Sequence, residues 1–167
     1  LAVGVLLATW DAHFRAVTRL AFTDDSETIL TGGADAAVFA YDVAQLVSVE
    51  RARGSGVAPV ATLQGHSLPI TALSVGFGGS SARVVTTSAD RTAHLWHLSS
   101  ARDIGSVLLS APAVDAAFAP DESACFLGLA SGAVVIVQPS QLSVAATVSD
   151  RSLPKVSPPV IQGKSSP

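Results

Sequence analysis

Short apolar runs alternate with turn-forming residues over most of the chain. The runs are four to seven residues long, are rich in Val, Ile, Thr and Phe, and are bounded by Gly, Asp, Ser or Pro. β-Branched and aromatic residues in short runs favour strands. No run extends over the ten or more residues at a 3.6-residue period that a core helix needs. The pattern therefore predicts an all-β protein built from short antiparallel strands.

Two stretches of the chain repeat the same order of features. In each, a histidine precedes an apolar run, a second run ends at an aspartate, and a third run closes on an aromatic residue. His66 follows His13 by 53 residues, whereas Asp90 follows Asp35 by 55. The extra two residues fall in the glycine-rich segment 76–81, and insertions collect in loops because strand pairing is then left intact. The predicted strands are 17–22, 29–33 and 38–42 in the first unit and 70–75, 84–88 and 93–97 in the second.

A third, weaker unit follows. It lacks the histidine and the aromatic residue, and its first loop is shortened to residues 119–122, a turn-forming sequence. A fourth apolar run completes each unit, so each unit predicts one four-stranded sheet. Such sheets arranged radially leave only short, protected edges. The third unit's predicted strands are 114–118, 125–129 and 134–137, and the fourth runs are 6–10, 60–63 and 104–109.

The order of Gly65-His66, Asp90 and Trp96 resembles that of a WD repeat, and a looser copy precedes it. The resemblance implies a β-propeller and a hydrogen-bonded tetrad inside each blade. This chemistry is reasonable, because a buried carboxylate needs hydrogen-bonding partners and an imidazole N–H can supply one. In the first unit a tyrosine stands in place of the tryptophan, and its hydroxyl does not lie where an indole N–H would, so we expect the first tetrad to be incomplete. The third unit has no such set of residues, and we expect it to be held by apolar packing alone. The implied tetrads are His66, Thr86, Asp90 and Trp96, and His13, Thr31, Asp35 and Tyr41.

At roughly 40 residues per blade, three units do not close a ring of four to eight blades. We therefore expect an incomplete propeller here, about three four-stranded blades of about seven, with the other blades supplied by a longer polypeptide. The absence of Met agrees with this expectation. The predicted organisation is repeat 1 with a strand of a neighbouring blade at 1–43, a linker loop at 44–59, repeat 2 at 60–98, a degenerate repeat 3 at 99–138, and an irregular Pro/Ser-rich tail at 139–167.

Five segments of the second unit, residues 66–71, 76–79, 82–84, 87–92 and 95–96, carry a narrower resemblance. They are similar to the WD-repeat subunits of the rixosome, which matures the large-subunit precursor of the ribosome and removes its internal transcribed spacer. That resemblance implies a nuclear protein of the nucleolus and nucleoplasm, present in two copies beside a helical-repeat scaffold subunit. It also implies contact with an AAA-type remodelling ATPase and the pre-ribosome. A WD-repeat adaptor in ubiquitin ligation, chromatin or cilia is the alternative.

A propeller hydrolase or lyase is the remaining alternative, because histidine, aspartate and Ser/Thr make up a hydrolase triad. The same set occurs twice at repeat spacing, however, which favours a structural role. The four histidines and one cysteine give no zinc-site spacing. His94 and His97 fall on opposite faces of a strand, and residues 76–79 lack the Lys-Ser/Thr of a phosphate loop. We expect no catalytic residue, cofactor or metal.

The composition and charge of the chain limit the kinds of partner that it could bind. Although 49% of the residues are hydrophobic and the mean hydropathy is +0.47, no apolar stretch reaches about 18 residues, so we expect no membrane span. Residues 1–8 read as an edge strand rather than a signal peptide. The net charge is −3 and the ten Lys and Arg residues are scattered, which argues against direct nucleic-acid contact. The single cysteine, Cys125, lies in an apolar run and reads as a buried small hydrophobic residue.

Phe77 and Arg83 are the candidate partner-contact residues. Phe77 lies on the glycine-rich loop, where it either packs back onto its blade or anchors a partner. Residues 48–56 read as a solvated surface loop, with two arginines that could alternatively touch RNA or an acidic partner.

Overall fold

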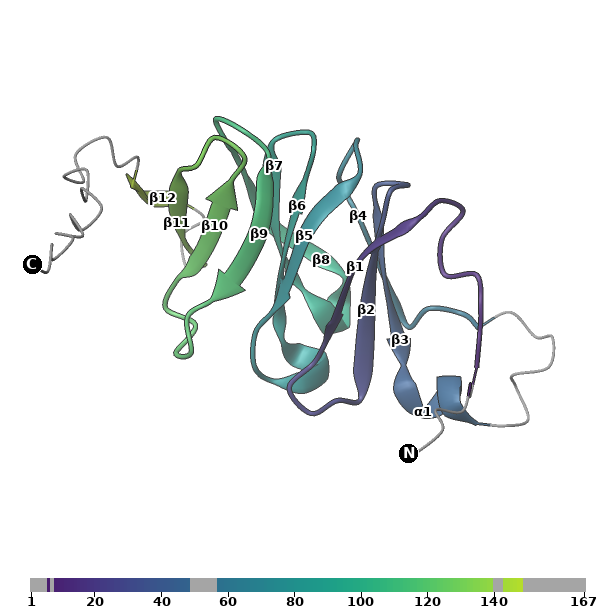
Figure 1. The fold of residues 1–167 in the computed structure, drawn as a ribbon. Helices are drawn as coiled ribbons and strands as arrows, with labels where there is room; N and C mark the ends of the chain where they lie inside the picture. Colours follow the sequence, from purple (N-terminus) through teal and green to yellow (C-terminus); the bar gives the residue numbers. More distant parts are fainter. Residues whose placement is uncertain (1–5, 7, 49–56, 140–142, 149–167) are drawn as a thin grey trace, which may run out of the picture.

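The computed structural model describes residues 6, 8–48, 57–139 and 143–148. Within this part, twelve strands form three four-stranded antiparallel sheets that stand side by side as blades 1, 2 and 3 (Figure 1). The predicted all-β propeller architecture is confirmed. Blade 1 consists of β1 (Val17–Phe22), β2 (Thr28–Gly33), β3 (Ala37–Asp42) and β4 (Ala61–Gln64); blade 2 of β5 (Ile70–Val75), β6 (Arg83–Ser88), β7 (Thr92–His97) and β8 (Arg102–Leu108); blade 3 of β9 (Ala113–Phe118), β10 (Cys125–Leu129), β11 (Val134–Gln138) and β12 (Ser143–Val148).

The three blades repeat in backbone detail as well as in strand order. The first strand of each blade pairs with the second through a register shift near its start, as between Val17 and Arg19 in blade 1 and between Ile70 and Ala72 in blade 2. The turn between the second and third strands contains one residue with positive φ in every blade. These residues are Ala36 (68°), Arg91 (67°) and Gly132 (86°).

Apolar side chains fill the two interfaces between blades. Successive residues of a strand point to opposite faces of the sheet, so Val84 of β6 packs toward blade 1 and Val85 packs toward blade 3. Each fully buried aliphatic side chain contributes about 1.5–3 kcal/mol. The core between blades 1 and 2 contains Leu30, Val38, Ala40, Leu63, Ile70, Val84, Trp96 and Leu98. The core between blades 2 and 3 contains Val85, Ala93, Leu95, Leu109, Ala113, Cys125, Leu127, Leu129, Val135 and Val137.

The blades have two distinct ends. At the hairpin end, the turns between second and third strands lie beside the segments that lead into each first strand, held by hydrogen bonds such as Ala34 N–H to Ala16 O (2.8 Å) and Ala89 N–H to Pro69 O (3.0 Å). The loop end carries the connections between first and second strands. The hairpin end comprises residues 13–16, 34–36, 65–69, 89–91, 110–112 and 130–133, and the loop end residues 23–27, 76–82 and 119–124.

Three sequence-based predictions differ from the structure. Residues 139–167 were expected to be irregular, but β12 pairs with β11; its Val- and Ala-rich run was obscured by the Pro and Ser around it. The predicted linker 44–59 includes most of the short helix α1 (Val43–Val47), which Asp42 caps by accepting a hydrogen bond from Gln45 N–H (3.1 Å). Residues 49–56 of that linker and 149–167 of the tail lie outside the described residues.

The third difference concerns the predicted strand at 6–10, of which residues 6 and 8–10 are described and lie in no strand. Their counterpart in the next repeat is β4, which pairs with the third strand of the preceding blade. Residues 8–10 would need the third strand of a preceding blade as their partner, and the described residues contain no such strand. Without that partner, the backbone hydrogen bonds between strands cannot form. The edge strand expected at 1–8 falls almost wholly outside the described residues.

Two single-turn 3-10 helices, η1 (Gly79–Ser81) and η2 (Leu98–Ser100), complete the described elements. None of the helices in the described ranges has the length and apolar character required to cross a membrane.

Candidate functional site

Blade 2 brings the four residues of its predicted tetrad into one hydrogen-bonded chain. The indole Nε1–H of the buried Trp96 donates to Thr86 Oγ1 (2.8 Å), and Thr86 Oγ1 lies 2.8 Å from His66 Nε2. His66 Nδ1 faces Asp90 Oδ2 at 3.2 Å. A carboxylate only accepts hydrogen bonds, so Nδ1 carries the proton and Nε2 accepts from the Thr86 hydroxyl. The hydrogen bonds therefore run in one direction, from indole to carboxylate.

The charges in this tetrad are set by burial and hydrogen bonding. Burial and the neighbouring His94 ring lower the pKa of His66 and outweigh the effect of Asp90, so the imidazole is neutral at pH 7. Burial alone would raise the pKa of Asp90. Hydrogen bonds from the Thr92 hydroxyl (2.6 Å), the Ser67 N–H (2.9 Å) and the Thr92 N–H (2.9 Å) instead hold the pKa of Asp90 well below its usual range. The carboxylate stays ionised because it is fully hydrogen-bonded.

Blade 1 builds the same arrangement with one substitution. His13 Nδ1 donates to Asp35 (2.8 Å to Oδ1), and His13 Nε2 lies 2.8 Å from Thr31 Oγ1. Tyr41 does not reach this hydroxyl; its own hydroxyl donates to the carbonyl of Ala12 at 3.2 Å. The tyrosine ring thus fastens the segment ahead of β1 rather than completing the chain of hydrogen bonds. Thr31 consequently serves one histidine, whereas Thr86 serves a histidine and an indole.

His94 extends the blade 2 network toward the surface. Its ring packs edge-on against His66, with centroids 4.5 Å apart, and stacks on Trp96 at 5.4 Å. Its Nδ1 hydrogen-bonds Asp103 Oδ2 at 2.7 Å. His97 lies on the opposite face of β7, near the Ser99 hydroxyl (3.2 Å). The sequence motif did not predict His94, because the contact joins residues on two strands.

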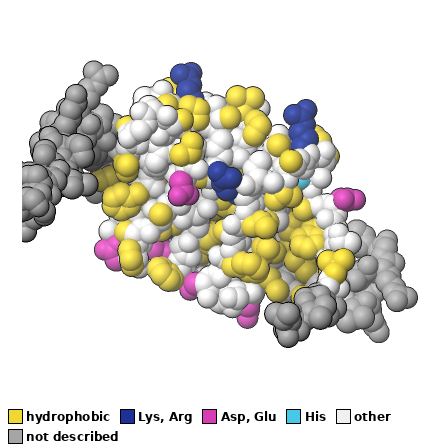
Figure 2. Space-filling view, viewed as in Figure 1, with side chains coloured by type: hydrophobic (Ala, Val, Ile, Leu, Met, Phe, Trp, Pro, Cys, Tyr) yellow, Lys and Arg dark blue, Asp and Glu magenta, His cyan; other side chains and the backbone are white. Residues whose placement is uncertain are grey.

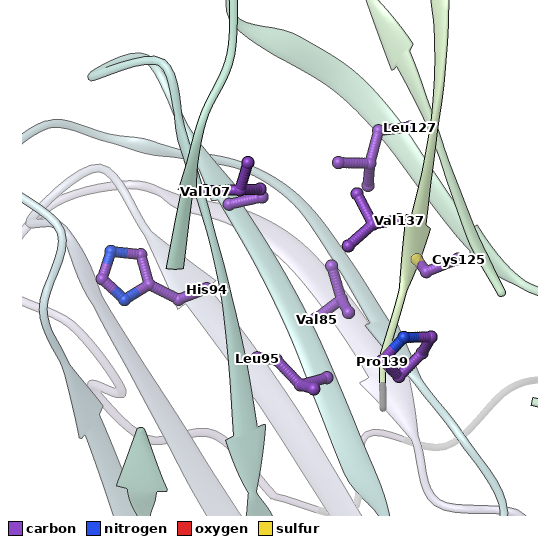
Figure 3. Close-up of a pocket in the computed structure, with 9 residues that line it drawn as sticks. Val85, His94, Leu95, Val107, Cys125, Leu127, Val137 and Pro139 are labelled. Atoms are coloured by element: carbon purple, nitrogen blue, oxygen red, sulfur yellow. The ribbon is translucent and has the colours of Figure 1, made fainter. Parts of the chain in front are cut away.

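Blade 3 has no histidine tetrad among its described residues and is held by apolar packing. Cys125 is fully buried against blade 2, and burial raises the pKa of its thiol to about 12. In Figure 3, Leu127 and Val137 lie near Cys125, with Val85 and Leu95 of blade 2 opposite them. The cavity between these side chains has a volume of about 10 Å³, room for one water molecule at most. This interface therefore has no space for a ligand.

No part of the described chain gathers three or more His, Cys, Asp or Glu side chains into a metal-binding group. The histidine–aspartate pairs lie within the blades, and both imidazole nitrogens of His13 and His66 are occupied by hydrogen bonds. A general base needs a free nitrogen within reach of a substrate proton. The geometry suits a structural role for these pairs.

The two candidate partner-contact residues flank one loop at the loop end. Phe77 is 57% exposed, so more than half of its surface is open to solvent. Arg83 is half-buried at the start of β6, and its carbonyl accepts a hydrogen bond from Gly76 N–H (2.8 Å) that closes the base of the loop. Phe77 and Arg83 thus come from the same loop and its adjoining strand.

Carboxylates of both neighbouring blades hold this loop. Asp24 of blade 1 accepts from the N–H groups of Gly79 (2.8 Å) and Gly78 (3.3 Å), and these bonds lower the pKa of Asp24. Glu122 of blade 3 accepts a hydrogen bond from the Phe77 N–H. Gly78 and Gly79 have φ values of 108° and 56°, a conformation that favours glycine. Sequence reasoning missed Asp24 and Glu122, because they come from loops about fifty residues to either side and belong to no motif.

Three blades of this topology, two of them carrying a histidine–aspartate–threonine network, define a WD-repeat β-propeller chain. The family model for the WD domain, G-beta repeat, matches residues 4–42 and 57–97, and the chain belongs to the WD-repeat family. The chain is similar to WD repeat-containing protein 18 of Danio rerio, with 35% identity over 131 residues, 78% of this chain and 30% of that protein. It is also similar to the pre-rRNA-processing protein pro-1 of Caenorhabditis briggsae, with 34% identity over 146 residues, 85% of this chain and 26% of that protein.

The chain thus spans less than a third of the length of these relatives. Among solved structures, the β-propeller domain of Cps50 (Swd1) from Myceliophteria thermophila matches with a TM-score of 0.64. That match covers 77% of this chain and 37% of the other, at 22% sequence identity. At this identity the likeness supports the fold alone.

Proposed function

We propose that this chain belongs to a non-catalytic protein-binding scaffold that acts in pre-rRNA processing. The carrying observation is the extent of the match to the pre-rRNA-processing protein of Caenorhabditis briggsae. That match covers 85% of the chain, whereas the general WD-repeat model matches only residues 4–42 and 57–97. The similarity therefore extends beyond the features that any WD repeat shares, and this favours ribosome assembly over an adaptor of ubiquitin ligation, chromatin or cilia.

The more specific assignment is a WD-repeat subunit of the rixosome. Its partners would be a helical-repeat scaffold subunit, an AAA-type remodelling ATPase and the pre-ribosome, and the protein would work in the nucleolus and nucleoplasm, in two copies per complex. The large-subunit precursor and its internal transcribed spacer would be processed by partner enzymes. The role of this chain would be to hold binding surfaces in a fixed geometry.

Further blades fit the open faces of blades 1 and 3. Leu20 and Phe22 of β1 are exposed, although their repeat counterparts Leu73 and Val75 pack in the core between blades 1 and 2. Since equivalent positions should be covered in an equivalent way, we infer that additional blades of the same polypeptide pack there, about four in a seven-bladed ring. The mass of the native polypeptide tests this inference, and a mature chain of 167 residues would contradict it.

Phe77 is the proposed partner anchor at the loop end, with Arg83 beside it. An exposed aromatic ring on a loop held from both sides loses little conformational freedom on binding, which suits a hot-spot residue. Phe77→Ala should weaken capture of the assembly partners by about tenfold or more. Ser80→Ala, on the same loop and also exposed, is the matched control and should leave capture unchanged.

Affinity purification of the intact tagged protein from its own cells tests the proposed function. The expected prey are a helical-repeat scaffold, an AAA-type ATPase and precursor ribosomal particles, and depletion of the protein should accumulate rRNA precursors that retain the internal transcribed spacer. Recovery of ubiquitin-ligase, chromatin or ciliary proteins in their place would reject the assignment.

Asp90→Ala separates the scaffold from an enzyme. A loss of folding in this variant supports a structural tetrad, whereas a folded variant that has lost a measurable hydrolase or lyase activity supports catalysis.

A further inference from the structure

Two equivalent segments at the hairpin end display apolar side chains directly after the tetrad histidines. Phe14 follows His13 and is 83% exposed, and Leu68 lies two residues after His66 and is 47% exposed. These segments lead into β1 and β5, so the two side chains come from adjacent blades at the same end. Exposed large apolar residues on equivalent segments of adjacent repeats mark a candidate interaction surface, although the repeat counterpart of Phe14 is Ser67 and that of Leu68 is Arg15.

The tetrads and hairpins hold the backbone of both segments. The Ser67 N–H donates to Asp90 Oδ2 (2.9 Å), and the Leu68 carbonyl accepts from the Ser88 hydroxyl (2.7 Å). In blade 1, the same histidine that precedes Phe14 is bonded to Asp35 and Thr31. These side chains are therefore displayed by ordered backbone, and a partner that contacts them loses little free energy in ordering the surface.

Two exposed arginines supply the positive charge at the hairpin end. Arg15 and Arg91 are exposed, and neither forms an ion pair with any residue in the described ranges. The Arg15 guanidinium carbon lies 6.0 Å from the centre of the Phe14 ring. Two of the nearby carboxylates are already bound to the tetrad histidines, which leaves the exposed Asp11 as the acidic side chain closest in sequence.

The loop end is more acidic than the hairpin end, whose exposed charged side chains are Arg15, Arg91 and Asp11. Its loops and the strand ends beside them carry seven carboxylates and two arginines among the described residues. In Figure 2, Lys and Arg side chains stand at the upper end and in the middle of the face, and most Asp and Glu side chains lie along the lower part. The seven carboxylates belong to Asp24, Asp25, Glu27, Asp42, Asp103, Asp121 and Glu122. A partner can therefore distinguish the two ends by charge.

We propose that the hairpin end, through Phe14, Leu68, Arg15 and Arg91, docks an acidic segment of a partner protein that also carries apolar side chains. Aromatic residues and arginine are enriched among interface hot spots, and apolar anchors need apolar partners. An RNA surface would need clustered cationic side chains to displace counterions, whereas two arginines at the same end as exposed apolar side chains favour protein. The proposal is separate from the proposed function, which assigns a partner anchor to the loop end.

Selection of short randomised peptides, displayed on phage, against the intact immobilised polypeptide tests the proposal. Synthetic copies of the enriched peptides are then titrated by fluorescence anisotropy. We expect enrichment in Asp and Glu together with Leu, Phe or Trp. The substitutions Phe14→Ala, Arg15→Glu and Arg91→Glu should each weaken binding by about tenfold.

Matched controls lie at the opposite end of the molecule. Ile104→Ala removes another exposed apolar side chain, near the loop-end start of β8, and Arg102→Glu reverses another exposed arginine; neither should change the affinity for the selected peptides. Circular dichroism and thermal melting show which variants are folded, and Arg15→Gln or Arg91→Gln replaces the corresponding charge-reversal variant where that variant does not fold.

Three results would overturn the proposal. The first is selection of Lys- and Arg-rich peptides or of none, and the second is an equal loss of affinity in the controls. The third is binding of a single-stranded RNA of mixed sequence that Arg15→Glu and Arg91→Glu abolish while peptide binding is unaffected, because the surface would then recognise nucleic acid.

Discussion

Replacement of Thr86 by valine removes one hydroxyl from the centre of blade 2 and keeps the branched shape of the side chain. Thr86 is fully buried, accepts from the Trp96 indole at 2.8 Å and serves His66 Nε2 at 2.8 Å. The variant leaves an indole N–H and an imidazole nitrogen without this partner. A buried polar group left unpaired costs about 1–3 kcal/mol, so with two such groups the variant should lose about 2–6 kcal/mol in its free energy of unfolding.

Thr31→Val in blade 1 is the internal comparison. His13 is the one side chain that the Thr31 hydroxyl serves, because Tyr41 donates to the Ala12 carbonyl; the further contact of this hydroxyl, to the Phe39 carbonyl, is long at 3.5 Å. Because this variant leaves one group unpaired rather than two, it should lose about 1–3 kcal/mol, half the loss expected for Thr86→Val. The two substitutions are chemically identical and occupy the same position of the repeat, so their difference isolates the contribution of the tryptophan bond.

Urea unfolding of the intact polypeptide, followed by tryptophan fluorescence, measures both losses. The free energy is extrapolated linearly to water, and an unchanged slope with denaturant shows that the unfolded state is the same. Equal losses in the two variants, or a larger loss for Thr31→Val, would refute the account of the tetrads given above.

Burial lowers the pKa of His66, so below about pH 6.5 the unfolded chain binds a proton that the folded chain does not, and the stability of the fold should decrease as the pH falls. Urea unfolding midpoints measured across this pH range should show the decrease, and the variant His66→Gln should make it smaller. The thiol of Cys125, with its pKa raised to about 12, should react with iodoacetamide only after unfolding, and peptide mapping that finds native labelling would contradict its burial. Gly79→Ala should cost about 1–3 kcal/mol, more than Gly132→Ala, in urea titrations. Both glycines have positive φ, but only at Gly79 would the new methyl group meet a neighbour, the Asp25 carboxylate, and equal effects would refute this explanation.

The repeat spacing predicted the blades well. β1, β5 and β10 begin and end at the predicted residues, since each is a β-branched or apolar run closed by turn-forming residues. The incomplete first tetrad was also predictable, because a phenol cannot place its hydroxyl where an indole places its N–H. Local composition and repeat spacing are sufficient for features that recur within one chain.

Features that depend on neighbouring blades were not predictable. Asp24 and Glu122 hold the Phe77 loop from loops with no common motif, and only the packing of three blades brings them together. The strand β12 was missed because its surroundings are rich in Ser and Pro, and its pairing with β11 determines its conformation. A long-range pairing leaves no periodic signal in a single sequence.

The origin of the outermost strands determines where this chain can be recombined. β4 closes blade 1 yet lies in the sequence repeat of blade 2, and β8 closes blade 2 yet follows that repeat. A chimaera that exchanges residues 60–98 as a module would import the last strand of one sheet and three strands of the next, and leave both with mismatched edges. Modular exchange, whether by gene duplication or by protein engineering, should succeed when the junctions fall just after β4 and β8, where an intact blade is transferred.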